Sequence, residues 1–561
     1  MAEDDTQPAP LSPERRDRLF PVLTPEQISR IAAHGTKRSV KEGEILIEQG
    51  DDMMRFFVVL SGEVEIVQPG CKNEKEITVH VPGEFVGDVS LLSGRRSIVR
   101  ARVGRSGEVI EVSRDQVMEL IQTDVEIGDI LMRAFILRRV ELIARGWGDA
   151  VILGTQGSAG TLRIREFLAR NGHPHTYIDL EHDSGVQEIL GRFHVTMDEV
   201  PILICRGSLV LRNPSNREVA DCLGFNAGID VSAVRDVVIV GAGPSGLAAA
   251  VYATSEGLSA IVLENYAPGG QAGSSSKIEN YLGFPTGISG QELAGRAFTQ
   301  AQKFGASTMI ARKATRLDCS DRPFAVLNEG SEPLRGRAIV IATGAQYRKL
   351  PLDNLSAFEG VGVYYGATFM EAQLCVSGEV IVVGGGNSAG QAAMYLSQTA
   401  EHVHVLVRSK GLADTMSRYL IRRIEDSPAI TLHPYTEIVA LNGEGHLESV
   451  RWRNNQTGAE EIRDIGHVFL MTGAVPSTEW LRGCVAMDDK GFIKTGTDLS
   501  PQDLTDAGWP LTRPPYMLET SQPGVFAVGD VRSNNVKRVA SAVGEGSIAI
   551  SFVHKVLQEQ A

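Results

Sequence analysis

The spacing of hydrophobic and polar positions changes several times along the chain, and each change predicts a different kind of element. From about Thr36 to Val112, short apolar runs broken by glycine turns are typical of an all-β segment. A helix capped by Thr24 is predicted before this segment, and a longer apolar-periodic helix runs from Arg114 to about Arg145. We therefore expect a β-roll with flanking helices in the N-terminal part.

The next segment, residues 148–228, alternates between short apolar runs typical of strands and the 3.6-residue spacing typical of helices. Its apolar runs include DAVILGT, TLRIREFLARNG, HTYIDLE and PILICRGSLVLR, and it closes on REVADCLG. This order predicts the elements β-α-β-α-β-β-α, which form a small α/β unit.

The remainder of the chain contains two buried strands that each lead into a glycine-rich turn and a helix of small residues. Val237–Val240 precedes GAGPSG, and Val380–Val383 precedes GGGNSA. Glycines at this spacing let the backbone approach a pyrophosphate at a helix N-terminus. Glu264, 18 residues after Gly246, closes the next strand, where a ribose hydroxyl would be held. Two dinucleotides bound to doubly wound sheets are therefore expected.

Composition excludes several classes of protein. At about 150 residues per domain, 561 residues suggest about four compact units. The net charge of −14, without a long Lys/Arg cluster, argues against nucleic acid as the main partner. The first ten residues are acidic, and no apolar stretch approaches the roughly 18 residues needed to span a bilayer. We expect a cytoplasmic protein without a membrane partner.

The cysteines and histidines predict neither a disulfide framework nor a metal site. No CxxC occurs, and Cys205 and Cys222 are expected to be buried small apolar side chains. Four histidines of the middle segment lack a metal-ligand spacing and are expected to be solvated or capping residues. The six cysteines are Cys71, Cys205, Cys222, Cys319, Cys375 and Cys484, and the four histidines are His173, His175, His182 and His194.

Residues 15–145 resemble a known sensor domain. The runs FFVVLSGEVEI and GEFVGDVSLLSGRRS are similar to the cyclic nucleotide-binding domain of cAMP-receptor proteins and cyclic-nucleotide-regulated kinases. The resemblance implies that Gly87, Asp88, Arg96 and Ser97 hold the ribose and cyclic phosphate of cAMP or cGMP. The ribose-binding Glu of the family is Asp88 here, and Arg95 is an alternative phosphate ligand. A docking module that no longer binds nucleotide is the other interpretation.

Residues 147–230 resemble the glutaredoxin branch of the thioredoxin fold. The resemblance rests on Glu199-Val200-Pro201 before a strand and on the closing helix, and it implies a cis bond before Pro201. The reactive dithiol of that family belongs at the turn occupied here by Ser158-Ala159-Gly160-Thr161. No thiolate can form there, so we expect a docking or coupling module.

Residues 234–561 resemble the low-molecular-weight thioredoxin reductases. Besides the two glycine loops, the resemblance rests on PGGQ, IENYLGFP, AIVIATGA, VFLMTGAVPST and the terminal GVFAVGD motif. It implies an FAD domain split into residues 234–353 and 476–561, a nicotinamide domain at 354–475, and a homodimer. The implied FAD residues are Gly241, Gly243, Ser245, Gly246, Glu264, Gly270, Gln271, Asn280, Gly344, Gly529, Asp530, Val539 and Ala540.

The residues implied to bind the nicotinamide nucleotide leave the choice between NADPH and NADH open. They are Gly384, Gly386, Asn387, Ser388, Ala389, Arg408 and Lys410. The NADPH-selective members carry a His-Arg-Arg run where this chain has Val407-Arg408-Ser409, so NADPH is expected and NADH is the alternative.

The redox cysteines of the thioredoxin reductases are replaced. Their CATC motif aligns with Gly366-Ala367-Thr368-Phe369, so no catalytic residue is assigned. Hydride transfer from nicotinamide to flavin needs no cysteine. The leading hypothesis is an FAD-dependent NAD(P)H oxidoreductase, regulated by cyclic nucleotide, with an external electron acceptor. That acceptor is a small redox protein, a quinone, oxygen or a small disulfide. The rival hypothesis is a redox sensor that binds the same ligands without meaningful turnover.

Overall fold

The computed structural model describes residues 13–52, 55–69, 74–155, 158–180, 199–206, 209–413 and 415–560. By their contacts these residues form two compact units. The first comprises Met1–Thr155, Phe167–Asp230 and Thr299–Ala311, and the second comprises Gln156–Glu166, Val231–Phe298 and Arg312–Ala561.

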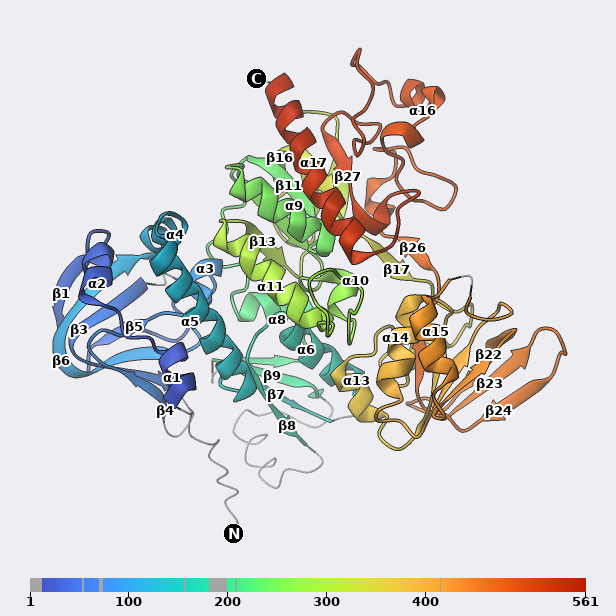
Figure 1. Ribbon diagram of the computed structural model, residues 1–561, viewed down its shortest axis with the longest axis horizontal. Helices are drawn as coiled ribbons and strands as arrows, with labels where there is room; N and C mark the ends of the chain where they lie inside the picture. Colours follow the sequence, from blue (N-terminus) through green and yellow to red (C-terminus); the bar gives the residue numbers. More distant parts are fainter. Residues whose placement is uncertain are drawn as a thin grey trace, which may run out of the picture. The chain divides into compact units, whose positions relative to one another are not determined.

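The first unit begins with an antiparallel roll (Figure 1). Its strand order is β1-β6-β3-β4, with β2 beside β6 and β5 beside β3. The strands are β1 (Thr36–Val40), β2 (Ile45–Ile47), β3 (Arg55–Gln68), β4 (Lys75–His80), β5 (Phe85–Val86) and β6 (Arg100–Ser113). These six strands confirm the predicted β segment, which among the described residues is interrupted only by a helix of four residues. The buried rings of Phe56 and Phe85 meet that of Phe135 from a helix that follows the roll.

The helices that flank the roll differ in one respect from the prediction. Helix α2 (Pro25–Ala32) starts at Thr24 with a capping box to Gln27, as expected. The single helix predicted from Arg114 to Arg145 is wrong, because the chain leaves the helical conformation at Asp124 (φ −108°, ψ 103°). The Asp124 carboxylate accepts from Ile127 N at 3.1 Å and starts a second helix. The remaining helices are α1 (Pro13–Leu19), α3 (Ser90–Ser93), α4 (Arg114–Thr123) and α5 (Val125–Ala144).

The middle segment forms a four-stranded sheet in the order β10-β9-β7-β8. Strand β7 pairs parallel with β8 and antiparallel with β9, and the Val200–Pro201 bond is cis, as the resemblance implies. The second helix predicted for this segment, like His182 and His194, lies outside the described residues. The elements are β7 (Ala150–Gly154), α6 (Ala159–Arg170), β8 (His175–Asp179), β9 (Ile202–Cys205), β10 (Leu209–Arg212) and α8 (Asn216–Cys222).

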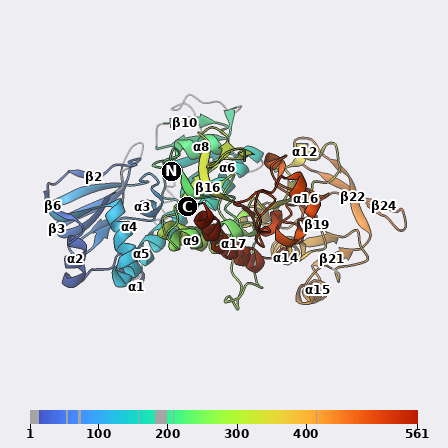
Figure 2. The same ribbon diagram turned by 90° about the horizontal axis from the view of Figure 1, so that it is seen from above.

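Parallel strands at the centre of the second unit carry the first glycine loop. The order is β12-β11-β16-β15-β14, and β27 pairs with β16. Helices α9 and α17 lie side by side over this sheet in both views (Figure 1 and Figure 2). The elements are β11 (Arg235–Val240), α9 (Pro244–Ser255), β12 (Ala260–Glu264), α10 (Gly270–Gly273), α11 (Gly290–Lys303), β14 (Ala314–Asp318), β15 (Phe324–Asn328), β16 (Leu334–Ile341), α16 (Pro501–Asp506), β27 (Val525–Ala527) and α17 (Val539–Glu559). Strand β13 (Ser307–Ile310) belongs to the first unit.

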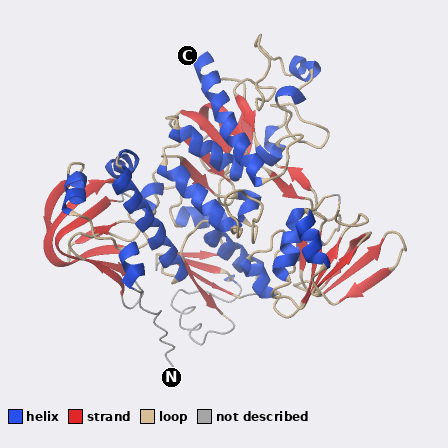
Figure 3. Ribbon diagram, in the orientation of Figure 1, coloured by secondary structure: helices blue, strands red, loops and turns tan. Residues whose placement is uncertain are grey.

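A second parallel sheet, β18-β25-β19-β20-β21, carries the second glycine loop. Beside it, β22, β23 and β24 form a separate antiparallel sheet (Figure 3). The elements are β18 (Val363–Tyr364), α13 (Phe369–Leu374), β19 (Glu379–Val383), α14 (Asn387–Leu396), β20 (His402–Leu406), α15 (Arg418–Glu425), β21 (Ile430–His433), β22 (Thr436–Asn442), β23 (Ser449–Asn454), β24 (Glu460–Arg463) and β25 (Val468–Leu470). The short pair β17 (Ala345–Tyr347) and β26 (Ala474–Pro476) and helix α12 (Leu355–Phe358) complete the unit.

The cysteines depart from the prediction. Cys205 and Cys222 are buried as expected, but they form a disulfide, and so do Cys319 and Cys484. The pairs are 17 and 165 residues apart in sequence, so no short motif could indicate them. Within the described ranges, no helix is long and apolar enough to cross a membrane, and no group of side chains could hold a metal ion.

Candidate functional site

The first glycine loop connects β11 to α9. Gly241 has φ +105°, and a Cβ there would lie 2.3 Å from the carbonyl oxygen of Ala342. Only glycine fits this conformation and this space. A Cβ on Gly243, by contrast, would meet nothing within 4 Å, although Gly243 starts helix α9. The first glycine thus shapes the turn, and the second leaves room for a phosphate at the helix N-terminus.

A carboxylate faces this loop from the end of β12. The buried Glu264 accepts from Ala242 N at 2.7 Å and from Tyr266 N at 2.8 Å. These bonds hold the carboxylate beside the glycine turn. An adenosine ribose in this position would find an acceptor for its hydroxyl groups.

The second glycine loop connects β19 to α14 and repeats the same geometry. Gly384 has φ +146°, and a Cβ there would lie 2.3 Å from the carbonyl oxygen of Met471. A Cβ on Gly386 would meet nothing within 4 Å. Beyond β20, Arg408 and Lys410 are exposed. Cations after the strand suit a phosphate better than a ribose hydroxyl.

Other predicted flavin residues fall into two groups. Gly270 and Gly529 pack on the first loop, since a Cβ on them would lie 3.1 Å from Gly243 Cα and 2.6 Å from Ser245 Oγ. Asp530 follows directly, and burial raises the pKa of its carboxyl group. The remaining residues lie elsewhere in the second unit: Gly344 after β16, Asn280 in an exposed loop, and Val539 and Ala540 at the start of α17.

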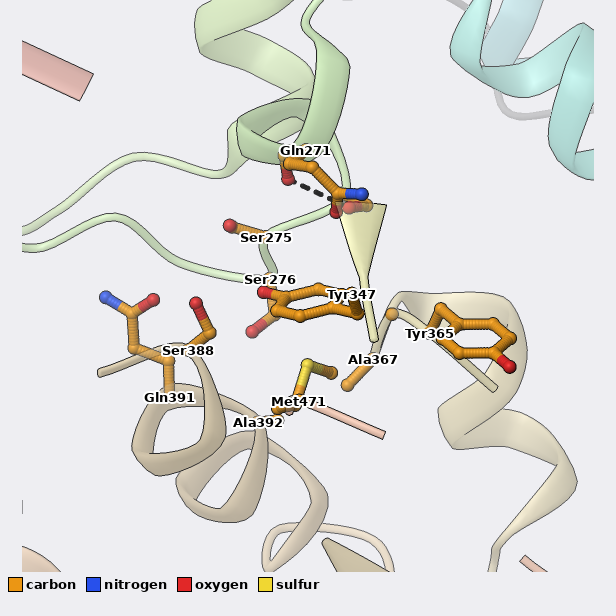
Figure 4. Close-up of a pocket in the computed structure, with 12 residues that line it drawn as sticks. Gln271, Ser275, Ser276, Tyr347, Tyr365, Ala367, Ser388, Gln391, Ala392 and Met471 are labelled. Carbon is orange, nitrogen blue, oxygen red and sulfur yellow. Dashed lines mark hydrogen bonds between the residues drawn. The ribbon is translucent and has the colours of Figure 1, made fainter. Parts of the chain in front are cut away.

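A pocket brings three predicted positions of the second unit together (Figure 4). Gln271 from the flavin set, Ser388 from the nicotinamide set and Gly366 from the replaced CATC motif all line it. The space that it encloses, counted together with the part open to solvent, is about 300 Å³. The other lining residues are Ser274, Ser275, Ser276, Tyr347, Tyr365, Ala367, Gln391, Ala392 and Met471.

Tyr347 is a pocket residue that sequence reasoning missed. Burial raises the pKa of its phenol, a hydrogen bond with Ser388 lowers it, and the charge of Asp530 raises it again. The phenol therefore stays protonated at neutral pH and remains a hydrogen-bond donor. Its only signal in the sequence is its position three residues after Gly344.

The CATC positions offer no reactive thiol. Gly366 faces Ser274, because a Cβ on Gly366 would lie 3.5 Å from the Cβ of that serine. Cys375 is the one free cysteine in the part of the chain that the structure describes. Burial, followed by the charge of Glu371, raises the pKa of Cys375 to about 12, and its thiol donates to Glu371 O at 3.1 Å. It is a protonated, buried side chain and not a nucleophile.

The four residues implied to bind a cyclic nucleotide lie in the segment between β5 and β6. Asp88 accepts from Arg139 Nη2 at 2.8 Å, and the Gly87 carbonyl accepts from Arg138 Nη1 at 2.7 Å. The Ser97 hydroxyl donates to Val99 O, and Arg96 Nε is buried without a hydrogen-bond partner among the described residues. Arg138 and Arg139 come from α5 and could not be assigned from local sequence. We call residues 87–97 the cassette.

Two family models match parts of this chain. A family model described as pyridine nucleotide-disulphide oxidoreductase matches residues 235–546, and one described as cyclic nucleotide-binding domain matches residues 37–124. The chain belongs to the pyridine nucleotide-disulphide oxidoreductase family. Within it, this is a thioredoxin reductase-like NAD(P)H/FAD oxidoreductase with an N-terminal cyclic nucleotide-binding domain.

Individual relatives each match about three-fifths of this chain. The "NADPH-dependent thioredoxin reductase 3" of Arabidopsis thaliana is 31% identical over 63% of this chain and 65% of its own length. The thioredoxin reductase of Bacillus subtilis is 30% identical over 58% of this chain and 96% of its own. The structure of Lactococcus lactis thioredoxin reductase is 27% identical, with a TM-score of 0.52 over 58% of this chain and 99% of that chain.

Proposed function

We propose that the chain oxidises NADPH through bound FAD and passes the electrons to an external acceptor. The observation that carries this proposal is the pocket where Gln271, Ser388 and Gly366 meet. It joins one residue expected near the isoalloxazine, one expected at the nicotinamide nucleotide, and the position of a replaced redox cysteine. Such a pocket without a thiol favours an acceptor that enters from solution.

Each group of the site has a defined part in this proposal. FAD, when bound, accepts a hydride from NADPH and passes its electrons on. The open backbone at Gly243 and Gly386 would hold the two pyrophosphates, and Glu264 would accept from the adenosine ribose. The Tyr347 phenol, kept protonated by burial, would donate to a molecule in the pocket.

The choice of NADPH rests on the exposed Arg408 and Lys410 after β20. A guanidinium and an ammonium group supply charge for a 2′-phosphate, and the related Arabidopsis protein is named NADPH-dependent. For the acceptor we retain a small redox protein, a quinone, oxygen or a small disulfide.

The other segments are assigned supporting parts. Residues 1–146 would bind cAMP or cGMP and regulate turnover, and residues 147–230 would be a cysteine-free glutaredoxin-like coupling domain. FAD would bind to residues 234–353 and 476–561, and the nicotinamide nucleotide to residues 354–475. We further propose a cytoplasmic homodimer, in keeping with the resemblance to soluble reductases.

Anaerobic stopped-flow measurement of flavin absorbance tests this function. FAD-loaded protein is mixed with NADPH or NADH, with and without cAMP. Bleaching near ~450 nm that is fast with NADPH supports the oxidoreductase. A rate that changes with cAMP supports regulation. No bleaching with either nucleotide would contradict the enzyme and favour the redox sensor.

A further inference from the structure

Three consecutive residues of the first unit, Gly224, Phe225 and Asn226, contact two distant parts of that unit. They follow helix α8, whose last residue Cys222 is held to β9 by its disulfide with Cys205. Gly224 has φ +66°, the left-handed conformation that commonly ends a helix. The disulfide and the glycine thus fix where this segment emerges. We call residues 224–226 the connector turn.

One side of the connector turn faces the two cassette arginines. The Arg95 guanidinium lies 4.4 Å from the centroid of the Phe225 ring, and its Nη1 donates to Asn171 O at 3.1 Å. A Cβ on Gly224 would lie 2.6 Å from Arg96 Cδ. Burial, followed by the charge of Arg139, lowers the pKa of Arg95 to about 9. An anion near these arginines would relieve that unfavourable environment.

Phe225 also anchors the turn in the middle segment. The residue is 2% exposed, and its ring stacks on Phe167 with the centroids 5.9 Å apart and lies 5.2 Å from the ring of His173. His173 is buried, not solvated as expected from the sequence, and its Nε2 lies 2.7 Å from Asp149 Oδ1. A ring packed on this many sides cannot absorb a movement of Arg95 without moving its neighbours.

The last residue of the connector turn, Asn226, contacts β13. Asn226 Nδ2 donates to Ile310 O at 2.9 Å, and Ile310 N donates to Asn226 Oδ1 at 2.7 Å. This two-point contact uses the amide side chain as a strand partner. Two residues further along the chain, Arg312 N donates to Glu264 O at 3.0 Å. Ile310 is therefore separated by one residue from a backbone contact of the predicted ribose ligand.

We propose that the connector turn is the docking surface through which the cassette arginines control strand β13. The role assigned to the ligand rests on the proposed function, whereas the docking itself does not. A bound cyclic phosphate draws Arg96 and Arg95 toward itself, and this changes their contacts with Gly224 and Phe225. Since coupling is reciprocal, breaking the Asn226–Ile310 contact also changes the affinity for the nucleotide.

Hydrogen exchange of the full-length, FAD-loaded protein tests the docking without any ligand. Arg95→Ala is expected to speed amide exchange at residues 224–226 and 307–310 by about fivefold or more, and to leave residues 55–68 of β3 unchanged. Arg105→Ala is the matched control, because Arg105 is an exposed arginine on β6 that pairs with Glu63. Unchanged exchange at 307–310 in Arg95→Ala would overturn the proposal.

A second variant at the same position guards against a general loss of stability. If β3 also exchanges faster in Arg95→Ala, that variant has destabilised the roll as a whole, and Arg95→Lys is measured instead. Lysine preserves the charge but cannot stack on Phe225 as a planar group. Faster exchange at 307–310 in that variant supports the docking, and wild-type exchange overturns it.

Calorimetry with cAMP distinguishes a failure of the docking proposal from a failure of the proposed cyclic-nucleotide binding. We expect cAMP to bind and to alter exchange at 224–226 and 307–310, and Asn226→Ala to change its Kd by about threefold or more. Binding that leaves both segments and the Kd of Asn226→Ala unaffected overturns the docking proposal. No heat of binding contradicts the sensor function, and the Arg95 variants then decide the docking on their own.

Discussion

The two glycine loops of the second unit share one backbone plan and differ in the charged residues near the end of the next strand. In both, the first glycine has a positive φ and lies against a carbonyl oxygen, and the second glycine faces open space. The first loop is then met by the buried carboxylate of Glu264, whereas the strand after the second loop leads to the exposed Arg408 and Lys410. In the proposed function, the shared glycines would hold a pyrophosphate, and the charge after the strand would select the nucleotide.

The largest expected effect comes from Gly243→Ala in the first loop. Its Cβ meets no protein atom, so we expect the free energy of unfolding of the apoprotein to change by less than about 0.5 kcal/mol. The methyl group would block the approach of the FAD pyrophosphate and weaken FAD binding about 100-fold. Titration of the apoprotein with FAD, followed by fluorescence quenching, measures this. Gly295→Ala, another glycine with open space, is the control and should bind FAD normally.

The equivalent change in the second loop, Gly386→Ala, should separate the two sites. FAD content is expected to stay at the wild-type level, while the rate of flavin bleaching by NADPH at subsaturating concentration falls about 30-fold. The absorbance ratio of flavin to protein and stopped-flow traces provide the measurements. Loss of FAD from this variant would refute the assignment of the loops to different nucleotides.

A smaller effect is expected from Arg408→Ala. Loss of one exposed guanidinium should raise KM for NADPH about tenfold, because a charge-assisted bond to the 2′-phosphate disappears, and leave KM for NADH within about twofold. Steady-state kinetics with ferricyanide as acceptor can determine both constants. Arg453→Ala, an exposed arginine on β23, serves as control. Equal changes for the two nucleotides would remove the basis for choosing NADPH.

The smallest effect concerns acid stability of the sheet behind the second loop. Burial, followed by the charge of His404, lowers the pKa of His433 to about 4. The unfolded chain binds a proton near pH 6.5 that the folded chain excludes, so folding stability falls as the pH drops from about 6.5 toward 4. His433→Asn should reduce this loss by about 1 kcal/mol, after allowance for partial exposure, in urea unfolding at pH 7 and 5. The exposed His446→Asn should not.

Sequence reasoning succeeded where a few neighbouring residues decide the structure. The strand, glycine turn and helix at both loops were predicted, as were the Thr24 cap and the position of Glu264 at a strand end. One local signal was misread, because Asp124 could continue the apolar helix or cap a new one. The packing of the two helices determines whether Asp124 continues the first helix or caps the second.

Contacts between residues far apart in the chain could not be predicted from the pattern of hydrophobic and polar residues. Tyr347, on strand β17, interacts with Ser388 and Asp530, which are 41 and 183 residues away in sequence. Asp88 meets Arg139 across 51 residues, and Cys319 meets Cys484 across 165. None of these pairs has a spacing that a motif could record.

The amino-acid sequence therefore determined the family, the two glycine loops and the absence of a CxxC motif at residues 366–369, because glycine conformation and residue chemistry are local properties. The tertiary structure alone decided that Gly366 opens into a pocket with Gln271 and that the connector turn joins the cassette arginines to β13. Such contacts depend on how elements pack after folding, and packing is set by the whole chain.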